Sequence, residues 1–223
     1  MRAGRAHVVI GVAALATAAL IGTVAERRAR THVVQAAFHF EGVTFDAPEL
    51  AARAGGPLTA DERRLVEATA RQEMTQAFAP WRIDITDAPA AHYRVRVVQS
   101  LGPRRGIGAM AAAESRVFGP LGGTGVVDFS TMAALAVGYA PPGTPRRALV
   151  AAVGRGIGRV AAHELAHQIL PHANFHVSRD ESSYDFAAAN RPRQFFGSAH
   201  WDLAGPWLDA ALGRRDPAAG AMP

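Results

Sequence analysis

The chain has 223 residues, 49% of them hydrophobic, which suits one domain with a buried core and an export segment before it. It contains no cysteine, which excludes disulfide bonds and thiolate metal sites, so any metal must be held by nitrogen and oxygen ligands. The formal net charge is +5, but the arginines that carry it are scattered singly and in pairs, which argues against nucleic-acid binding.

Residues 1–25 have the composition of a targeting segment. Arg2 and Arg5 form a basic start, residues 8–24 are mostly apolar and uncharged, and small residues up to Ala25 suit a signal-peptidase cut. We therefore expect export, with a periplasmic or secreted product. Two alternatives stay open, a cleaved signal peptide or an N-terminal membrane anchor, because the apolar run is near the lower limit for crossing a bilayer. Residues 26–223 are expected to form a single domain.

The first part of this domain has strand and helix patterns in turn. Residues 31–40 alternate with the two-residue period of a half-buried strand, and a loop rich in proline and glycine follows. Thr59 and Glu62 have the spacing of a capping box, which predicts the start of a helix that ends at Pro80. Two short strands with alternating apolar and polar residues are predicted next, at 81–86 and 93–97.

The middle of the chain has weaker signals. Residues 102–123 are rich in glycine and small residues without a period, which predicts a long loop. Residues 124–130 are predicted to form a strand at the edge of the sheet. A proline-rich turn then precedes a long helix from Arg146 to about Ile169, and a closing helix is predicted at 202–212, before a frayed tail at 216–223.

The long helix has an unusual pattern. Its apolar residues form one stripe, with Arg155 and Arg159 on the opposite side. Glu164 and His167 continue the apolar stripe, and His163 lies at its margin, so three ionisable side chains face the core. Burying them unpaired would cost several kcal/mol, and a divalent metal with an activated water would satisfy all three.

Three glycines in the same helix are interpreted structurally. Gly154, Gly156 and Gly158 follow no strand and have no acidic partner at the spacing of a dinucleotide site. They therefore predict close packing of the helix against the sheet.

The end of the long helix carries His163-Glu164-Leu165-Ala166-His167, which has the form H-E-x-x-H. On a helix the two histidines lie one turn apart on one face and can bind one ion, and Glu164 lies beside them to take a proton from a metal-bound water. Catalytic zinc usually has three protein ligands. Pro171 ends the helix and lets the chain fold back, so the candidates for the third ligand are His172, His176 and the carboxylates of Asp180 and Glu181.

The segment HELAHQILPHANFH resembles the metzincin branch of the HExxH zinc metallopeptidases, the zincins, whose signature is HExxHxxGxxH followed by a turn with methionine. The glycine and the methionine are missing here, and neither His172 nor His176 falls at the family spacing. The run HVSRDESSYDF resembles the continuation of matrixin-like sequences, with Tyr184 where the methionine would be. This likeness favours His176 over His172 as the third ligand.

The resemblance implies an α+β, zincin-like fold, with a small mixed sheet packed on the long active-site helix and a C-terminal helix. It implies an exported zinc metalloendopeptidase in which His163, His167 and His176 hold Zn²⁺ and Glu164 is the general base. Tyr184 is expected either to donate to the oxyanion or to serve as a core aromatic. A peptide or protein substrate is expected to pair with the strand at 124–130, and the protein is expected to be a monomer.

An alternative of another class stays open, since the missing glycine and methionine also suit a protein without activity. In that case the chain is an exported zinc-containing binding or structural protein on the same scaffold. The aromatic residues near the C-terminus are expected to form a small satellite core rather than a pocket wall, and His200 is expected to be structural; the aromatic residues are Phe195, Phe196 and Trp201.

Overall fold

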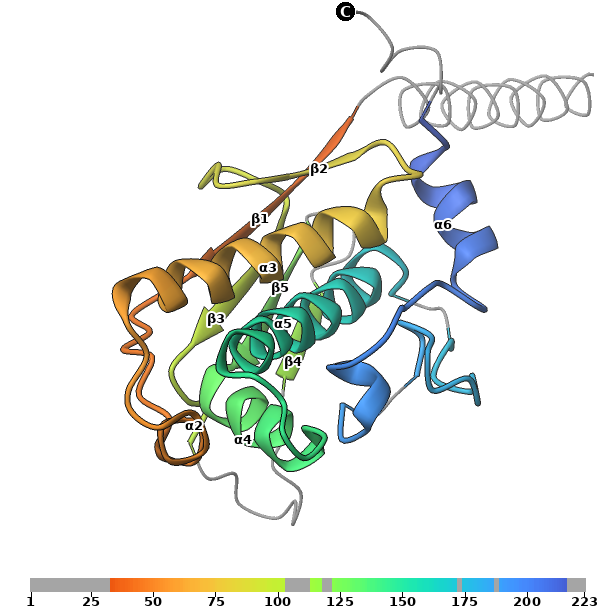
Figure 1. The fold of residues 1–223 in the computed structure, drawn as a ribbon. Coiled ribbons are helices and arrows are strands. Elements are labelled where there is room, and N and C mark those ends of the chain that lie inside the picture. The colour runs from red at the N-terminus through yellow and green to blue at the C-terminus, as the bar shows by residue number, and fades with distance from the viewer. Residues whose placement is uncertain (1–32, 103–112, 118–121, 172–173, 187–188, 216–223) are drawn as a thin grey trace, which may run out of the picture. The chain divides into compact units, whose positions relative to one another are not determined.

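Five strands of the computed structural model form one mixed sheet (Figure 1). They are β1 (Val34–Phe40), β2 (Ile83–Thr86), β3 (Tyr93–Val98), β4 (Ala113–Val117) and β5 (Gly123–Asp128). Their order is β2-β1-β3-β5-β4; the first four run parallel, and β4 pairs antiparallel with β5. The structure describes residues 33–102, 113–117, 122–171, 174–186 and 189–215. The predicted export segment and the predicted C-terminal tail lie outside these ranges.

The edge of the sheet differs from the prediction. The strand predicted at 124–130 is β5, and it is internal because it pairs with β3 on one side and β4 on the other. Buried strands read as continuous apolar runs, and Val126 and Val127 are accordingly buried. The edge strand on this side of the sheet is β4, which lies inside the segment predicted to be a loop, and β2 is at the other edge. Its sequence AESRV is polar and at least partly exposed throughout, so it lacks the apolar alternation of a half-buried strand.

Helices α3 (Ala60–Phe78) and α5 (Arg146–Ile169) confirm the two long helices of the prediction. The capping box of α3 has both of its hydrogen bonds, from Glu62 N to Thr59 Oγ1 at 3.3 Å and from Thr59 N to Glu62 Oε2 at 2.9 Å. The closing helix is α6 (Gly205–Leu212), three residues shorter than predicted at its start.

Two further helices are not in the prediction. Helix α2 (Pro48–Ala54) lies in the predicted loop, with Pro48 in its first turn and Gly55 ending it at φ 78°. Helix α4 (Phe129–Tyr139) begins directly after β5, where Asp128 caps it by accepting from Thr131 N at 2.8 Å. Because the strand and the helix share an apolar run, the prediction extended the strand to residue 130.

Helix α5 lies beside α3 on one face of the sheet and contacts strands β3, β5 and β4 (Figure 1). A Cβ at Gly154 would lie 2.5 Å from Val66 O, and one at Gly158 would lie 2.4 Å from Ala70 O. The prediction that these glycines pack against the sheet is therefore wrong, because Gly154 and Gly158 pack closely against α3, and a Cβ at Gly156 would lie 2.3 Å from the ring of Phe195. We call the contact of Gly154 and Gly158 with the α3 backbone the glycine seam.

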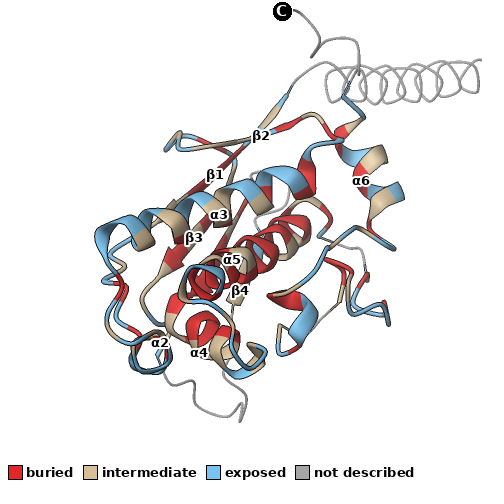
Figure 2. Cartoon of the chain, viewed as in Figure 1, coloured by how far each residue is buried: buried red, intermediate tan, exposed pale blue. Residues whose placement is uncertain are grey.

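Helix α5 is buried on almost all sides, as Figure 2 shows by its colouring. The side of the helix opposite the apolar stripe, on which Arg159 was placed, is not open to solvent there, because the Arg159 side chain is only 4% exposed. It forms an ion pair with Glu73 of α3 at 2.8 Å. The predicted single apolar stripe of α5 is therefore too narrow, because α3, α4 and the sheet contact this helix on several sides.

Candidate metal centre

Three histidines converge at the C-terminal end of α5. His163 and His167 are one turn apart on the same face of the helix, and α5 ends at Ile169 before Pro171, as predicted. The chain then returns, and His176 reaches the other two. The Nε2 atoms lie 3.1 Å apart for His163 and His167, 3.0 Å for His163 and His176, and 2.7 Å for His167 and His176.

The tautomer of His163 is set by its second nitrogen. Its Nδ1 lies 2.6 Å from the backbone carbonyl oxygen of Tyr184, which can only accept, so Nδ1 carries the proton. In the neutral ring Nε2 then has its lone pair directed at the other two histidines, which is the form that binds metal.

Burial keeps the cluster neutral. It lowers the pKa of His163 to about 3, with a further contribution from His167. It lowers the pKa of His167 to about 4, and it also lowers the pKa of His176. All three imidazoles are therefore uncharged near neutral pH and do not repel a cation.

Phe175 supports the histidines from one side. It is fully buried, and its ring lies 4.6 Å from that of His167 and 5.6 Å from that of His163, measured between centroids. No role was predicted for this residue, although it lies within the segment that contains the histidines. An aromatic ring in this place holds both imidazoles by packing.

Glu164 is buried between α5 and the two last strands of the sheet. A Cβ at Gly125 of β5 would lie 3.2 Å from Glu164 Cβ, so the glycine makes room for the carboxylate side chain. Ser115 of β4 donates to the Glu164 backbone carbonyl at 3.0 Å. Burial raises the pKa of Glu164 to about 7, opposed by a hydrogen bond from Ser115 and reinforced by Glu114. Glu164 thus lies next to the exposed edge strand.

Tyr184 joins the cluster through its backbone rather than its hydroxyl. While its carbonyl accepts from His163, its hydroxyl donates to Glu73 Oε1 at 3.2 Å. The ring is buried against Trp201, with 4.9 Å between centroids. Glu73 was not singled out in the sequence, since nothing in α3 marks it as a partner of a residue far along the chain.

The other candidates have different places. His172 lies outside the described residues. Asp180 pairs with His200 at 3.1 Å and accepts from Ser182 N at 2.8 Å, and it is not part of the histidine cluster. Phe195 is fully buried in the main core and not in a separate satellite core, and Trp201 lines a pocket, which the prediction did not favour.

The donor set fits a zinc ion. Three neutral imidazole nitrogens whose atoms lie within 4.8 Å of one another are the only group of three or more such ligands among the described residues. Tetrahedral zinc, with Zn–N bonds of about 2.0–2.1 Å, spaces its ligand atoms roughly 3.3 Å apart, close to the separations seen here. His176 is exposed, so solvent can reach a fourth position.

No family model matches the chain, and no curated protein matches its sequence. Among the residues that the structure describes, no helix is both long and apolar enough to cross a membrane.

Proposed function

We propose that the chain is an exported, zinc-dependent metallopeptidase with a zincin-like fold. The observation that carries the proposal is the convergence of three imidazole Nε2 atoms, at most 3.1 Å apart, at the C-terminal end of α5. A buried glutamate adjoins the first of these histidines in the sequence. Three nitrogen ligands with an open fourth position are typical of catalytic rather than structural zinc sites. The carboxylate of Glu164 also favours catalysis, since a structural site needs no such group beside its ligands.

Each residue has a role in this proposal. His163, His167 and His176 would hold the ion, which supplies a bound water of lowered pKa and polarises a carbonyl when present. Glu164 takes a proton from the attacking water and returns it to the leaving amine. Tyr184 fixes the ring of His163 through its backbone carbonyl. Its hydroxyl donates to Glu73 here, which favours this positioning role over donation to an oxyanion.

The edge strand offers a place for an extended substrate. β4 is the last strand of the sheet order, and β5 is its one neighbouring strand among the described residues. Ser115 of this strand contacts the backbone of Glu164, so the strand runs beside the general base. A peptide that adds to β4 by backbone hydrogen bonds would therefore pass close to the histidines.

Metal analysis of the purified full-length chain tests the site. We expect about one zinc per chain in the wild type and in His172→Ala, and a loss of zinc in His167→Ala and in His176→Ala. Retention of zinc by His176→Ala with loss in His172→Ala would reassign the third ligand. A folded wild type that takes up no zinc after its addition would refute the metal centre.

A second experiment separates catalysis from a structural role of the metal. Glu164→Gln is expected to keep zinc and fold but to lose at least about a hundredfold in kcat/KM on a mixed peptide library analysed by mass spectrometry. Glu49→Gln, an exposed glutamate in α2, is the matched control and should cleave like the wild type. Equal cleavage by Glu164→Gln and wild type would contradict the peptidase proposal and favour the alternative, a zinc-containing binding or structural protein.

A further inference from the structure

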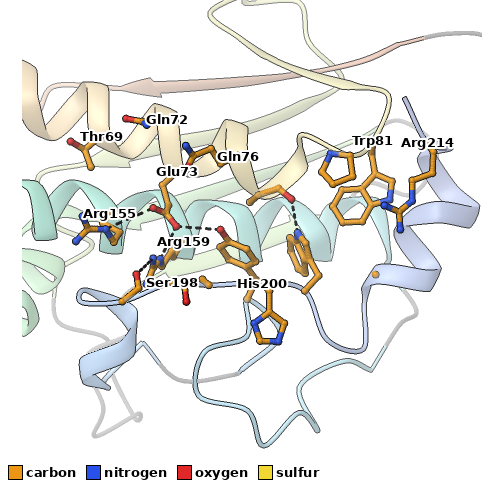
Figure 3. A pocket seen from close by; sticks show the side chains of 17 residues that line it. Thr69, Gln72, Glu73, Gln76, Trp81, Arg155, Arg159, Ser198, His200 and Arg214 are labelled. Carbon is orange, nitrogen blue, oxygen red and sulfur yellow. Dashed lines mark hydrogen bonds and ion pairs between the residues drawn. The ribbon is translucent and has the colours of Figure 1, made fainter. Parts of the chain in front are cut away.

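A pocket of about 600 Å³ lies between α3, α5 and the segment that leads to α6 (Figure 3). Glu73 and Gln76 of α3, Arg155 and Arg159 of α5, and Trp201 contribute to its walls. None of the three clustered histidines is among its described lining residues. The volume is in the range of sites for small organic ligands.

The polar end of the pocket has an excess of positive charge. Arg155 and Arg159, one turn apart on α5, both point toward the single carboxylate of Glu73 (Figure 3). Arg159 is the closer partner of this carboxylate, because its Nε lies 2.8 Å from Glu73 Oε1. Its Nη2 also donates to the backbone carbonyl of Gly197 at 2.7 Å. Tyr184 donates to the same carboxylate oxygen at 3.2 Å.

Arg155 is left with a weak partner for its charge. Within the described residues it donates to Phe195 O at 2.7 Å, and its Nε comes no closer than 3.9 Å to Glu73 Oε2. Its side chain is 30% exposed, so it can still reach a ligand. Burial lowers the pKa of Arg155, and the neighbouring charge of Arg159 lowers it further. An anion beside Arg155 would compensate this charge.

The other charged groups of the pocket have acidic partners outside it. Arg214 pairs with Asp209 at 2.6 Å, and His200 pairs with Asp180 at 3.1 Å. The unbalanced positive charge is therefore located at the Arg155 end.

The opposite part of the pocket is aromatic. Trp201 packs between Tyr184 and Trp81, with ring centroids 4.9 Å and 6.2 Å away. Its Nε1 donates to Ala77 O at 2.7 Å, so the polar atom of the indole is already satisfied and its apolar surface remains for a ligand.

We propose that this pocket binds a small organic carboxylate with an aromatic or aliphatic body, with the carboxylate on Arg155 and the body along Trp201. Such a ligand supplies one negative charge where two guanidinium groups share one carboxylate. The proposal does not depend on peptidase activity.

Isothermal titration calorimetry of the full-length chain with 3-phenylpropionate tests the proposal. The neutral isostere 3-phenylpropionamide is expected to bind at least about tenfold more weakly, because it cannot form a charge-assisted bond with Arg155. Equal affinities for the acid and the amide, or no binding of the acid, would overturn the proposal. This comparison uses the wild type and so does not depend on the folding of any variant.

Variants place the site. Arg155→Gln is expected to weaken binding of the acid at least about tenfold, whereas Arg147→Gln, an exposed arginine of the same helix, should leave it unchanged and controls for net charge. Unchanged binding in Arg155→Gln refutes the site. Repeating the titration in His167→Ala excludes binding through a metal: binding must persist there, and its disappearance would assign the acid to the histidines.

Discussion

A hydrogen bond of 2.6 Å joins His163 to the backbone carbonyl of Tyr184 and so connects the end of α5 to the turn that follows it. The same tyrosine is tied to α3 through its hydroxyl and Glu73. The orientation of the first histidine therefore depends on a contact between three segments, and not on α5 alone.

The tie to α3 predicts the behaviour of Tyr184→Phe. The variant loses one hydrogen bond, but Glu73 keeps Arg159 as its partner, so the free energy of unfolding should fall by about 1 kcal/mol. Because the backbone carbonyl is unchanged, we expect zinc content to be the same and kcat to stay within about threefold. Chemical denaturation and steady-state kinetics measure both. A hundredfold loss of kcat at unchanged stability would instead support donation from the hydroxyl to an oxyanion.

Glu62 predicts a dependence of stability on pH. Hydrogen bonds from Arg146, at 2.6 and 2.8 Å, and from the backbone of Thr59 lower the pKa of Glu62 to about 2. A depressed carboxyl pKa stabilises the fold above the unfolded value of 4.5, and this stabilisation is lost as pH falls from there toward 2. Since the pair is partly open to solvent, Glu62→Gln should cost about 1–2 kcal/mol at pH 7.

The measurement is urea denaturation of Glu62→Gln and wild type between pH 3 and pH 7, with Glu67→Gln, an exposed residue of the same helix, as control. The difference between Glu62→Gln and wild type should shrink as the pH falls. A difference that is the same at both ends of this range would mean that the ion pair is not its source.

The glycine seam predicts that Gly158→Ala is strongly destabilising. The new methyl group would lie 2.4 Å from Ala70 O, so the two helices would have to separate, at a cost of about 2–3 kcal/mol. In Gly138→Ala of α4 nothing lies within 4 Å of the new Cβ, and this control should be stabilised by about 0.4–1 kcal/mol. Thermal unfolding of both variants checks the pair. Similar effects at the two positions would contradict the close helix contact.

Replacement of Gln168 is expected to lower the free energy of unfolding at a second position of α5. Gln168 is 1% exposed, and its amide accepts from Arg94 N at 3.3 Å and donates to Arg94 O at 3.2 Å. Gln168→Met keeps the shape but removes both bonds from β3, so we expect a loss of about 2–3 kcal/mol of unfolding free energy. Gln72→Met, at an exposed position of α3, serves as the reference. A loss no larger than that of the reference would show that β3 does not depend on this amide.

The sequence predicted the parts of the fold that have local signals. The capping box of α3 and the proline after α5 each depend on a few neighbouring residues, and α3 begins and α5 ends where those residues indicate. The pair His163 and His167 follows from helical spacing alone. His176 was favoured through resemblance to a family, and the structure brings it to the other two.

Other parts depend on contacts that no local pattern carries. Strand β4 is the last strand of the sheet order, and its residues are polar and at least partly exposed. Its sequence therefore lacks the apolar alternation that predicts a strand, and a loop was predicted instead. The buried position of Arg159 depends on Glu73, a residue 86 positions earlier. Tyr184 was predicted either to donate to an oxyanion or to be a core aromatic. Its hydrogen bond to α3 was not predicted, since the partner lies 111 positions away.

Where two helices touch through backbone atoms, as α5 and α3 do at Gly154 and Gly158, there is no side chain to adjust by changing its rotamer. Any displacement of α5 along its neighbour would have to carry both helices together. The last turn of α5 thus fixes the positions of His163 and His167. In the proposed metal site, adaptation to an ion of another size would come from the segment that carries His176. To change the metal preference of the proposed site, a designer should therefore vary residues 174–186 and leave α3 and α5 unchanged.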